Sequence, residues 1–312
     1  MILVTGGTGF IGQSLIRRLV EEGHSVRTLI RPSSQSPKLP QGIPVQAAIS
    51  SLADERGLRA AMVGVDVVYH LAGVNWTDRP LDWHRTEVEG TRNVIEAAQD
   101  AGVKRLLYMS HLGADRAAAY PLFKAKGIAE ERIRKSPIPY TILRSGLVFG
   151  PDDNFTYPLA QLLALSLSVF PLAGDGLALV QPLWVEDLVS CLIWALDEEE
   201  SINSLFEVGG PEHLTIREVI DEVQAAIGVS QSMLTIRPSY MRMIVGLLRF
   251  FLPKLPASNI WFDYLSASRI TELNTLPRIF GLMPARFSHH LEHLKGRKWR
   301  RSLLPRFLRP SA

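Results

Sequence analysis

The sequence has little cysteine, which excludes stabilisation by disulfides within the chain and bears on the redox compartment of the protein. Cys191 is the single cysteine among 312 residues, so no disulfide can form within the chain. It lies in an apolar stretch with Leu188 and Leu192, where a thiol is typical of a packed core and not of a nucleophile. Because Met1 directly precedes an apolar strand, we expect no secretory signal peptide. These features favour a reducing, cytoplasmic location.

Long hydrophobic runs are also missing. Residues 240–252 form an apolar segment that ends at Pro253, but it carries Arg242 and Arg249. A helix needs about 20 apolar residues to cross a bilayer, and this segment is shorter. We therefore expect a helix that is buried or lies at an interface, and contact with a membrane that is peripheral at most.

Acidic residues are absent from residues 295–312, which contain seven lysines and arginines. The whole chain has a net charge of +3, so the rest of the chain is at −4. The basic balance belongs to this tail and gives no reason to expect nucleic-acid binding. With Trp299 and Phe307, the tail has the composition of a segment that contacts a protein complex or an anionic membrane surface. A solvated tail is the alternative.

The strongest positive signal is a glycine-rich turn between a strand and a helix at the N-terminus. Ile2-Leu3-Val4 is a short apolar strand, residues 14–20 form an amphipathic helix, and Gly6, Gly9 and Gly12 lie between them at G-x-x-G-x-x-G spacing. Such a turn brings backbone N–H groups close to a pyrophosphate at the positive end of a helix. The sequence therefore predicts a dinucleotide site here, with a glycine turn that binds nothing as the alternative.

Strands and helices alternate through the first half of the chain. The predicted strands cover 2–5, 25–30, 67–70, 105–110 and 140–143, and the predicted helices lie near 11–22, 55–63, 84–101 and 122–135. Repeated strand–helix units of this length predict an α/β fold with a doubly wound parallel sheet, the Rossmann fold. Ligands of such sheets bind at the carboxyl ends of the strands.

The pattern loosens after Gly150-Pro151, where loops separate helices near 185–197 and 214–227. We predict an NAD(P)-binding core over 1–150 and a basic tail over 295–312. Between them, residues 151–294 should form a smaller, mostly helical substrate or partner region that interleaves with the core and caps its cleft.

Several short motifs occur in the same order along the chain. They are T-G-G-T-G-F-I-G at residues 5–12, H-L-A-G at 70–73, E-G-T-R-N at 89–93, Y-T-I-L-R at 140–144, V-F-G at 148–150, W-V-E-D-L at 184–188 and V-G-G-P at 208–211. Taken together, these motifs resemble those of extended or atypical short-chain dehydrogenases/reductases, which are NAD-dependent epimerase/dehydratase-like proteins. Within that superfamily the chain is similar to the branch of the dehydrogenase-like accessory subunit of respiratory complex I and of the photosystem assembly factors.

The resemblance implies which residues hold the cofactor. The pyrophosphate would contact the glycine turn, the riboses would lie over the segment after the third predicted strand, and a lysine would bind the nicotinamide ribose. These positions are occupied by Gly6, Thr8, Gly9, Phe10, Ile11, Gly12, Leu71, Ala72, Gly73 and Lys126.

Arg31 bears on which dinucleotide is bound. It follows the second predicted strand, where an acidic residue would bond the ribose 2′-hydroxyl of NAD. An arginine can instead bind a 2′-phosphate through two parallel hydrogen bonds. We therefore expect NADP(H) more than NAD(H), the alternative being a solvated surface arginine.

Catalysis in the family depends on a Tyr-x-x-x-Lys pair on one helix, in which the lysine lowers the pKa of the phenol. Tyr120 and Lys124 have this spacing, but the family's glutamate lies four residues after its lysine. Counting back from Glu130 gives Lys126 and places Leu122 at the tyrosine position. The catalytic tyrosine is therefore predicted to be missing.

Two further observations bear on catalysis. Pro121 suits the first turn of a helix, which places Tyr120 at or before the helix start. The family's catalytic hydroxyl is also missing, since His111-Leu112-Gly113 follow Ser110. Any remaining proton transfer would depend on Tyr120 and His111 as candidate catalytic residues, with a packed His111 as the alternative. The other histidines and acidic residues lack metal-ligand spacing, so no metal site is predicted.

Two functions remain open. The first is an NAD(P)-binding protein with weak or no tyrosine-based redox catalysis that acts in the assembly or sensing of a partner complex. The second is an active oxidoreductase, an NADPH-dependent reductase or epimerase with a non-standard proton donor. The substrate region lies in the irregular second half, and fold alone does not name a substrate.

Overall fold

A computed structural model describes residues 1–33, 39–74, 83–166, 168–251, 261, 264–297 and 299 of the chain. The protein divides into two compact units, and each is described by itself. The first unit contains Met1–Ser145, Val185–Val208 and Thr275–Leu282. The second contains Gly146–Trp184, Gly209–Asn274 and Met283–Ala312.

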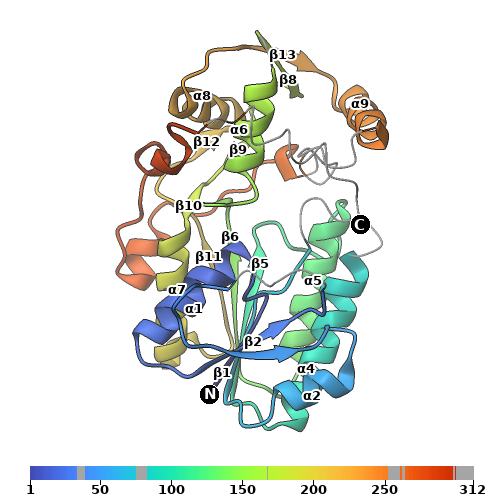
Figure 1. The fold of residues 1–312 in the computed structure, drawn as a ribbon, viewed down its shortest axis with the longest axis vertical. Helices are drawn as coiled ribbons and strands as arrows, with labels where there is room; N and C mark the ends of the chain where they lie inside the picture. Colours follow the sequence, from blue (N-terminus) through green and yellow to red (C-terminus); the bar gives the residue numbers. More distant parts are fainter. Residues whose placement is uncertain are drawn as a thin grey trace. The chain divides into compact units, whose positions relative to one another are not determined.

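A seven-stranded parallel sheet forms the centre of the first unit, in the order β11-β6-β5-β4-β1-β2-β3 (Figure 1). Every strand pair in it is parallel. The sheet order reverses direction at β1, which is the doubly wound topology that the alternating pattern predicts. The strands are β1 (Ile2–Thr5), β2 (Val26–Ile30), β3 (Gln46–Ile49), β4 (Val67–His70), β5 (Arg105–His111), β6 (Tyr140–Ser145) and β11 (Ser204–Val208).

Helices cover both faces of this sheet. On one side α1 packs against α7, and on the other α4 packs against both α2 and α5 (Figure 1). An apolar core fills the space between these four strands, β1, β4, β5 and β6, and the helix layer of α2, α4 and α5. Leu3, Val94 and Leu106 are fully buried in it. The helices are α1 (Phe10–Glu21), α2 (Glu55–Ala61), α4 (Gly90–Asp100), α5 (Pro121–Lys135) and α7 (Val185–Asp197), with π-helix η1 (His84–Glu89) directly before α4 and short helices η2 (Glu199–Ser201) and η3 (Leu276–Phe280).

Two edge strands were not predicted from the sequence. β3 reads Gln-Ala-Ala-Ile and is largely exposed. It contains a single β-branched residue, Ile49, and lacks the alternation of apolar and polar residues that marks a strand. β11 at the opposite edge is half-buried over most of its length. Edge strands face solvent on one side, and their hydrophobic pattern is correspondingly weak.

In the second unit, the described residues form three longer helices and three two-stranded sheets. Pairs β7–β10 and β8–β13 are parallel, and β9–β12 is antiparallel. The elements are α6 (Thr156–Leu165), α8 (Ile216–Ile227), α9 (Pro238–Phe251), β7 (Val148–Phe149), β8 (Val169–Ala173), β9 (Leu179–Val180), β10 (Leu183–Trp184), β12 (Leu214–Thr215), β13 (Ser232–Ile236) and short helices η4 (Phe287–His290) and η5 (Glu292–Leu294).

Helix α9 is the apolar segment that the sequence places near residues 240–252. Only Met241 and Val245 of this helix are buried. Met243 and Leu247 are exposed by 65% and 61%, so α9 is a surface helix and not a core helix. None of the helices in the described ranges is long and apolar enough to cross a membrane.

The start of the basic tail corrects one part of the sequence interpretation. Trp299, expected to face a membrane or a partner, is 5% exposed and lies edge-on to Tyr157 with a centroid separation of 5.0 Å. Its indole N–H donates to the carbonyl of Leu294 at 3.1 Å. The indole therefore packs within the second unit. Burial there removes its apolar ring from water, and the hydrogen bond satisfies its N–H group. Phe307 lies outside the described residues.

Candidate functional site

The glycine turn after β1 has no space for side chains. Gly6 has a φ of +76°, and a Cβ there would lie 2.7 Å from the backbone nitrogen of Ala72. A Cβ on Gly12 would lie 2.3 Å from the carbonyl oxygen of Gly6. Both positions therefore require glycine. Gly9 is exposed and Gly6 is half-buried, so this part of the backbone is accessible to a ligand, as a pyrophosphate needs.

Helix α1 begins at this turn. Gly9 is its N-cap residue, and in this fully described helix no side chain caps the terminus and no acidic residue lies in the first turn. The first N–H groups of a helix have no partner within the helix, and its N-terminus carries a partial positive charge. Thr8, Phe10 and Ile11, all half-buried, surround this end. The local chemistry fits the anionic phosphates of a dinucleotide.

The segment after β4 lies directly beside the turn. Leu71 donates its backbone N–H to the carbonyl of Thr5 at 3.1 Å. Ala72 donates to the hydroxyl of Thr5 at 3.3 Å. Both residues are half-buried, so the structure brings the predicted residues Gly6 and Ala72 together at the carboxyl ends of β1 and β4.

His70, the last residue of β4, is a neutral structural histidine. Its Nδ1 is 2.7 Å from the hydroxyl of Thr5, and its Nε2 is 3.0 Å from the hydroxyl of Thr91. Complete burial, together with the nearby charge of Lys126, lowers the pKa of His70 to about 3. Its imidazole therefore fixes the end of β4 and carries no charge at neutral pH.

Lys126 of α5 points into the interior at the same edge. Its ammonium nitrogen lies 2.9 Å from Glu87 Oε2 and donates to the carbonyl of Met109 at 3.0 Å. A lysine has three donors, these contacts account for two of them, and the ammonium also lies 4.9 Å from the centroid of the Tyr108 ring. A Cβ on Gly73 would come 3.5 Å from the Lys126 nitrogen, so the lysine lies next to the predicted ribose segment.

Glu87 is a site residue that the sequence reasoning missed. It lies in η1, is 1% exposed, and accepts a hydrogen bond from the backbone N–H of Val74 at 3.0 Å. The phenol of Tyr108, also buried, donates to it at 3.4 Å. No local sequence pattern marks Glu87 as buried; the structure places it in η1, four residues before buried Thr91 of α4. A buried carboxylate needs a cationic partner, which Lys126 supplies.

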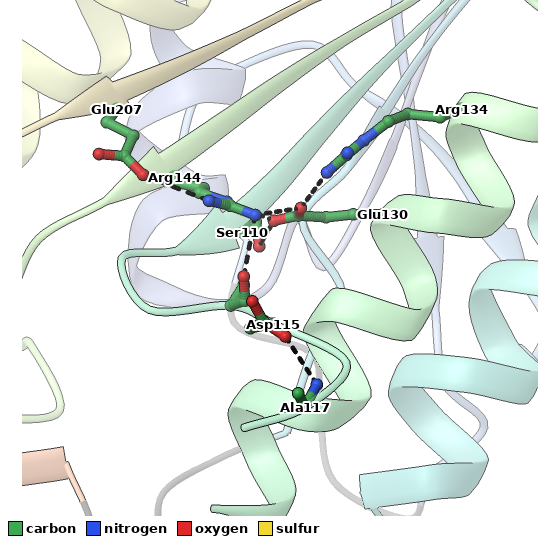
Figure 2. Close-up of polar contacts among 8 residues, drawn as sticks. Ser110, Asp115, Ala117, Glu130, Arg134, Arg144 and Glu207 are labelled. Carbon is green, nitrogen blue, oxygen red and sulfur yellow. Dashed lines mark hydrogen bonds and ion pairs between the residues drawn. The ribbon is translucent and has the colours of Figure 1, made fainter. Parts of the chain in front are cut away.

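The rotational position of α5 is set by a second buried carboxylate, Glu130, one turn after Lys126 (Figure 2). Glu130 is fully buried and accepts the hydroxyl of Ser110 at 2.6 Å and two donors of Arg144 at 2.9 and 2.7 Å. Arg134 adds a contact at 2.6 Å. Because this network links α5 to the ends of β5 and β6, it fixes which face of the helix is turned inward.

The face turned inward carries Leu122, Lys126 and Glu130, all buried, whereas Lys124 is exposed. Helix α5 begins at Pro121, and Tyr120 is its extended N-cap residue, as the proline predicts. Tyr120 is therefore outside the helix, half-buried, and leucine occupies the position one turn before the buried lysine.

The remaining predicted residues lie on loops or strand ends of the first unit. His111 is the last residue of β5 and is half-buried. Arg31 is exposed directly after β2. Its exposure leaves the guanidinium accessible to a phosphate beyond the end of the strand, and His111 and Tyr120 are half-buried.

Two other interpretations concern Cys191 and metal binding. Cys191 is buried in α7, and burial raises the pKa of its thiol, as expected for a packed residue.

Asp153 caps α6 by accepting hydrogen bonds from the backbone N–H groups of Phe155 and Thr156. Within the described part of the chain, no group of three histidine, cysteine or acidic side chains is arranged to hold a metal ion.

Comparison with known proteins agrees with this geometry. The sequence pattern of the NAD(P)H-binding family matches residues 6–159. The chain is 30% identical over 253 residues to a 2-alkyl-3-oxoalkanoate reductase of Stenotrophomonas maltophilia, covering 73% of this chain and 76% of that protein.

Two further relatives are named for protein complexes. The mitochondrial NADH dehydrogenase [ubiquinone] 1 alpha subcomplex subunit 9 of Arabidopsis thaliana is 27% identical over 70% of this chain, and the match spans just over half, 56%, of that protein. The photosystem II assembly factor Ycf39 of Synechocystis is 24% identical, with 80% of this chain and 74% of that protein covered.

Solved structures share the fold. A UDP-glucose 4-epimerase of Thermotoga maritima superposes with a TM-score of 0.73, covering 97% of this chain and 99% of that chain at 20% identity. The likeness extends over nearly the whole chain and shows the architecture.

Proposed function

Because the chain belongs to the NAD(P)H-binding family of atypical short-chain dehydrogenases/reductases, we propose that it is a cofactor-binding component in the assembly or sensing of a partner complex. In this proposal the first unit binds NADP(H) and performs little or no tyrosine-based redox chemistry. A nicotinamide dinucleotide would supply hydride transfer where a proton donor is in place.

The observation that carries the proposal is the environment of Lys126. The lysine is buried beside the Leu71–Gly73 segment, as a ribose-binding lysine should be, but Leu122 lies one turn before it on the same face. A leucine cannot exchange a proton with a substrate. Binding is therefore supported by the chain's own residues, and the usual acid–base step is not.

The adjacent groups support the same reading. Glu87 and Met109 orient the lysine nitrogen, and the turn at Gly6 and Gly12 provides the close approach that a pyrophosphate needs. Arg31 beyond β2 favours NADP(H), since no acidic side chain follows that strand in the described residues up to 33. The named role of two relatives in protein complexes favours a partner-directed function.

A second candidate, an NADPH-dependent reductase or epimerase, is favoured by the relative at 30% identity, which is named as a reductase. Tyr120 is the N-cap residue of α5 and is half-buried. In this alternative its hydroxyl would replace the missing tyrosine as the proton donor.

A turnover experiment separates the two functions. The protein, loaded with NADPH, is mixed with a panel of 3-oxoacyl esters while absorbance at 340 nm is followed. In parallel, protein loaded with NADP⁺ is mixed with aldoses and the ratio of epimers is measured by chromatography, because an epimerase returns the hydride to the sugar and leaves the absorbance unchanged. The proposal predicts no turnover above the protein-free rate in either assay, with wild type and Tyr120→Phe alike. Turnover in either assay that Tyr120→Phe abolishes, while Tyr140→Phe leaves it intact, would establish the second candidate instead.

A further inference from the structure

The second unit contains an apolar cavity of about 520 Å³, a size usual for small-molecule sites. Its walls come from α6, β8, α8 and α9 together with Trp261, and all of them belong to that unit. Representative wall residues are Leu159, Leu162, Leu172, Ile220, Val245 and Trp261. The cavity thus shares no lining residue with the proposed dinucleotide site, which is built from residues of the first unit.

The cavity reaches the surface along α9. Ile244 and Leu248 line it and are also exposed to solvent by 38% and 41%. Met243 and Leu247 continue the apolar surface on the same helix and are more exposed still. A ligand entering here crosses an apolar rim, which suits a molecule that partitions into lipid and not a sugar or a nucleotide.

The polar side chains that line the cavity determine which polar head group a bound ligand can carry. Ser166, Asp175 and Ser266 are the hydroxyl- and carboxyl-bearing residues that line it within the described part of the chain. Asp175 is exposed, and its carboxylate accepts the backbone N–H of Leu177 at 3.0 Å. The guanidinium of Arg217 lies beside this carboxylate, donates to the backbone carbonyl of Asp175 at 3.2 Å and is not part of the lining. Among the described lining residues the charged side chain is therefore acidic, so a hydroxyl, an amide or a cation can bind to it, whereas an anionic head group has no cationic partner in the lining.

We propose that this cavity binds a single hydrocarbon chain, acyl or prenyl, whose neutral or cationic head group lies at Asp175. The chain occupies the space between α6 and α9, and the α9 rim is its entrance. Each additional buried methylene raises the affinity about fourfold until the chain fills the cavity, after which the gain stops.

Head-group preference is tested with full-length protein and the neutral dye N-phenyl-1-naphthylamine, whose fluorescence rises in apolar sites. 1-Decanol and decyltrimethylammonium are expected to displace the dye at concentrations at least tenfold lower than decanoate. Asp175→Asn should reduce this difference to within about threefold. If decanoate displaces the dye as well as 1-decanol from wild type, the assignment of Asp175 is wrong.

Chain length tests whether the cavity itself is occupied. With 1-alkanols of increasing length, Ala173→Leu, which narrows the cavity, should shift the preferred length to a shorter chain. Leu159→Ala, which widens it, should shift the preference to a longer chain, so the test survives if one variant fails to fold.

The matched control is Leu247→Ser on the exposed part of α9, outside the cavity lining. It should leave the preferred chain length unchanged. Loss of binding in Leu247→Ser together with an unchanged preference in both cavity variants would show adsorption to the outside of α9 and overturn the proposal.

Discussion

Lys126 and Lys124 lie two residues apart on α5 in opposite environments. Lys126 is buried against Glu87, whereas Lys124 is exposed. Replacing Lys126 alone would leave a buried carboxylate without its partner, at a cost of about 3–5 kcal/mol in folding free energy. The informative variant is therefore Lys126→Met combined with Glu87→Gln, which removes both charges.

We expect this double variant to bind NADPH at least tenfold more weakly than the wild type, because the proposed donor to the nicotinamide ribose is gone. Fluorescence titration measures the change, and far-UV circular dichroism checks that the variant is folded. Lys124→Met should bind as the wild type does. If Lys124→Met instead loses affinity for NADPH and the double variant does not, Lys124 is the lysine that binds the nicotinamide ribose. Tyr120 and Lys124 would then form the catalytic pair.

His70 makes the stability of the protein sensitive to acid. Its pKa is about 3 in the folded protein and about 6.5 in an unfolded chain, so below pH 6.5 the unfolded chain takes up a proton that the folded protein does not. Stability from this residue is therefore complete above pH 6.5 and falls as the pH drops toward 3. At pH 5 the expected loss is about 2 kcal/mol.

Urea unfolding at pH 7.5 and pH 5 measures this loss for wild type and for His70→Asn. The variant is less stable at pH 7.5 because hydrogen bonds to Thr5 or Thr91 are lost, but its change between the two pH values should be smaller. The exposed His84 provides the control, and His84→Asn should keep the wild-type dependence. If the free energy of unfolding changes equally between the two pH values in all three proteins, His70 titrates normally and this prediction is wrong.

At the level of elements, α5 is positioned by Glu130 (Figure 2). Glu130→Gln should lower the free energy of unfolding by about 3 kcal/mol, because Arg144 loses its buried partner. Glu131→Gln on the next residue breaks only surface ion pairs with Arg116 and Lys135 and should cost less than about 1 kcal/mol. Urea unfolding compares them, and equal losses would show that the network does not hold the helix.

Elements with strong periodicity were predictable from the sequence. Helix α1 was expected near 11–22 and spans Phe10–Glu21, and α5 was expected near 122–135 and spans Pro121–Lys135. The weakly patterned edge strands were not, since β3 buries little of its surface. The helix expected over 84–101 begins with the π-helical turn η1, because the sequence periodicity does not distinguish a π-helical turn from an α-helical one.

The candidate site was predictable in part for the same reason. Glycines report backbone constraints directly, so Gly6 and Gly12 could be placed from their spacing alone. The ion pair of Lys126 with Glu87 joins two helices 39 positions apart in the chain, and no local pattern encodes that contact. The apolar cavity likewise arises from four elements that meet only in the folded second unit.

At the scale of the whole molecule, the basic tail remains the predicted contact with an anionic membrane or partner. Trp299 packs inside the second unit, so the test removes only residues after 300, among them Arg301, Arg306 and Arg309. Removal takes away three of the tail's seven basic residues and should weaken salt-sensitive co-sedimentation with phosphatidylserine vesicles about 100-fold, since each basic residue near the surface contributes about 1 kcal/mol. Full-length protein that fails to sediment at low salt would show a solvated tail.

Binding of the dinucleotide by the intact protein tests the central claim most directly. NADPH and NADH are titrated separately into full-length wild-type protein while nicotinamide fluorescence is followed. The glycine turn and Lys126 predict saturable binding of one dinucleotide per chain, and Arg31 predicts that NADPH binds more tightly than NADH. Absence of saturable binding for both dinucleotides would contradict the assignment of the site.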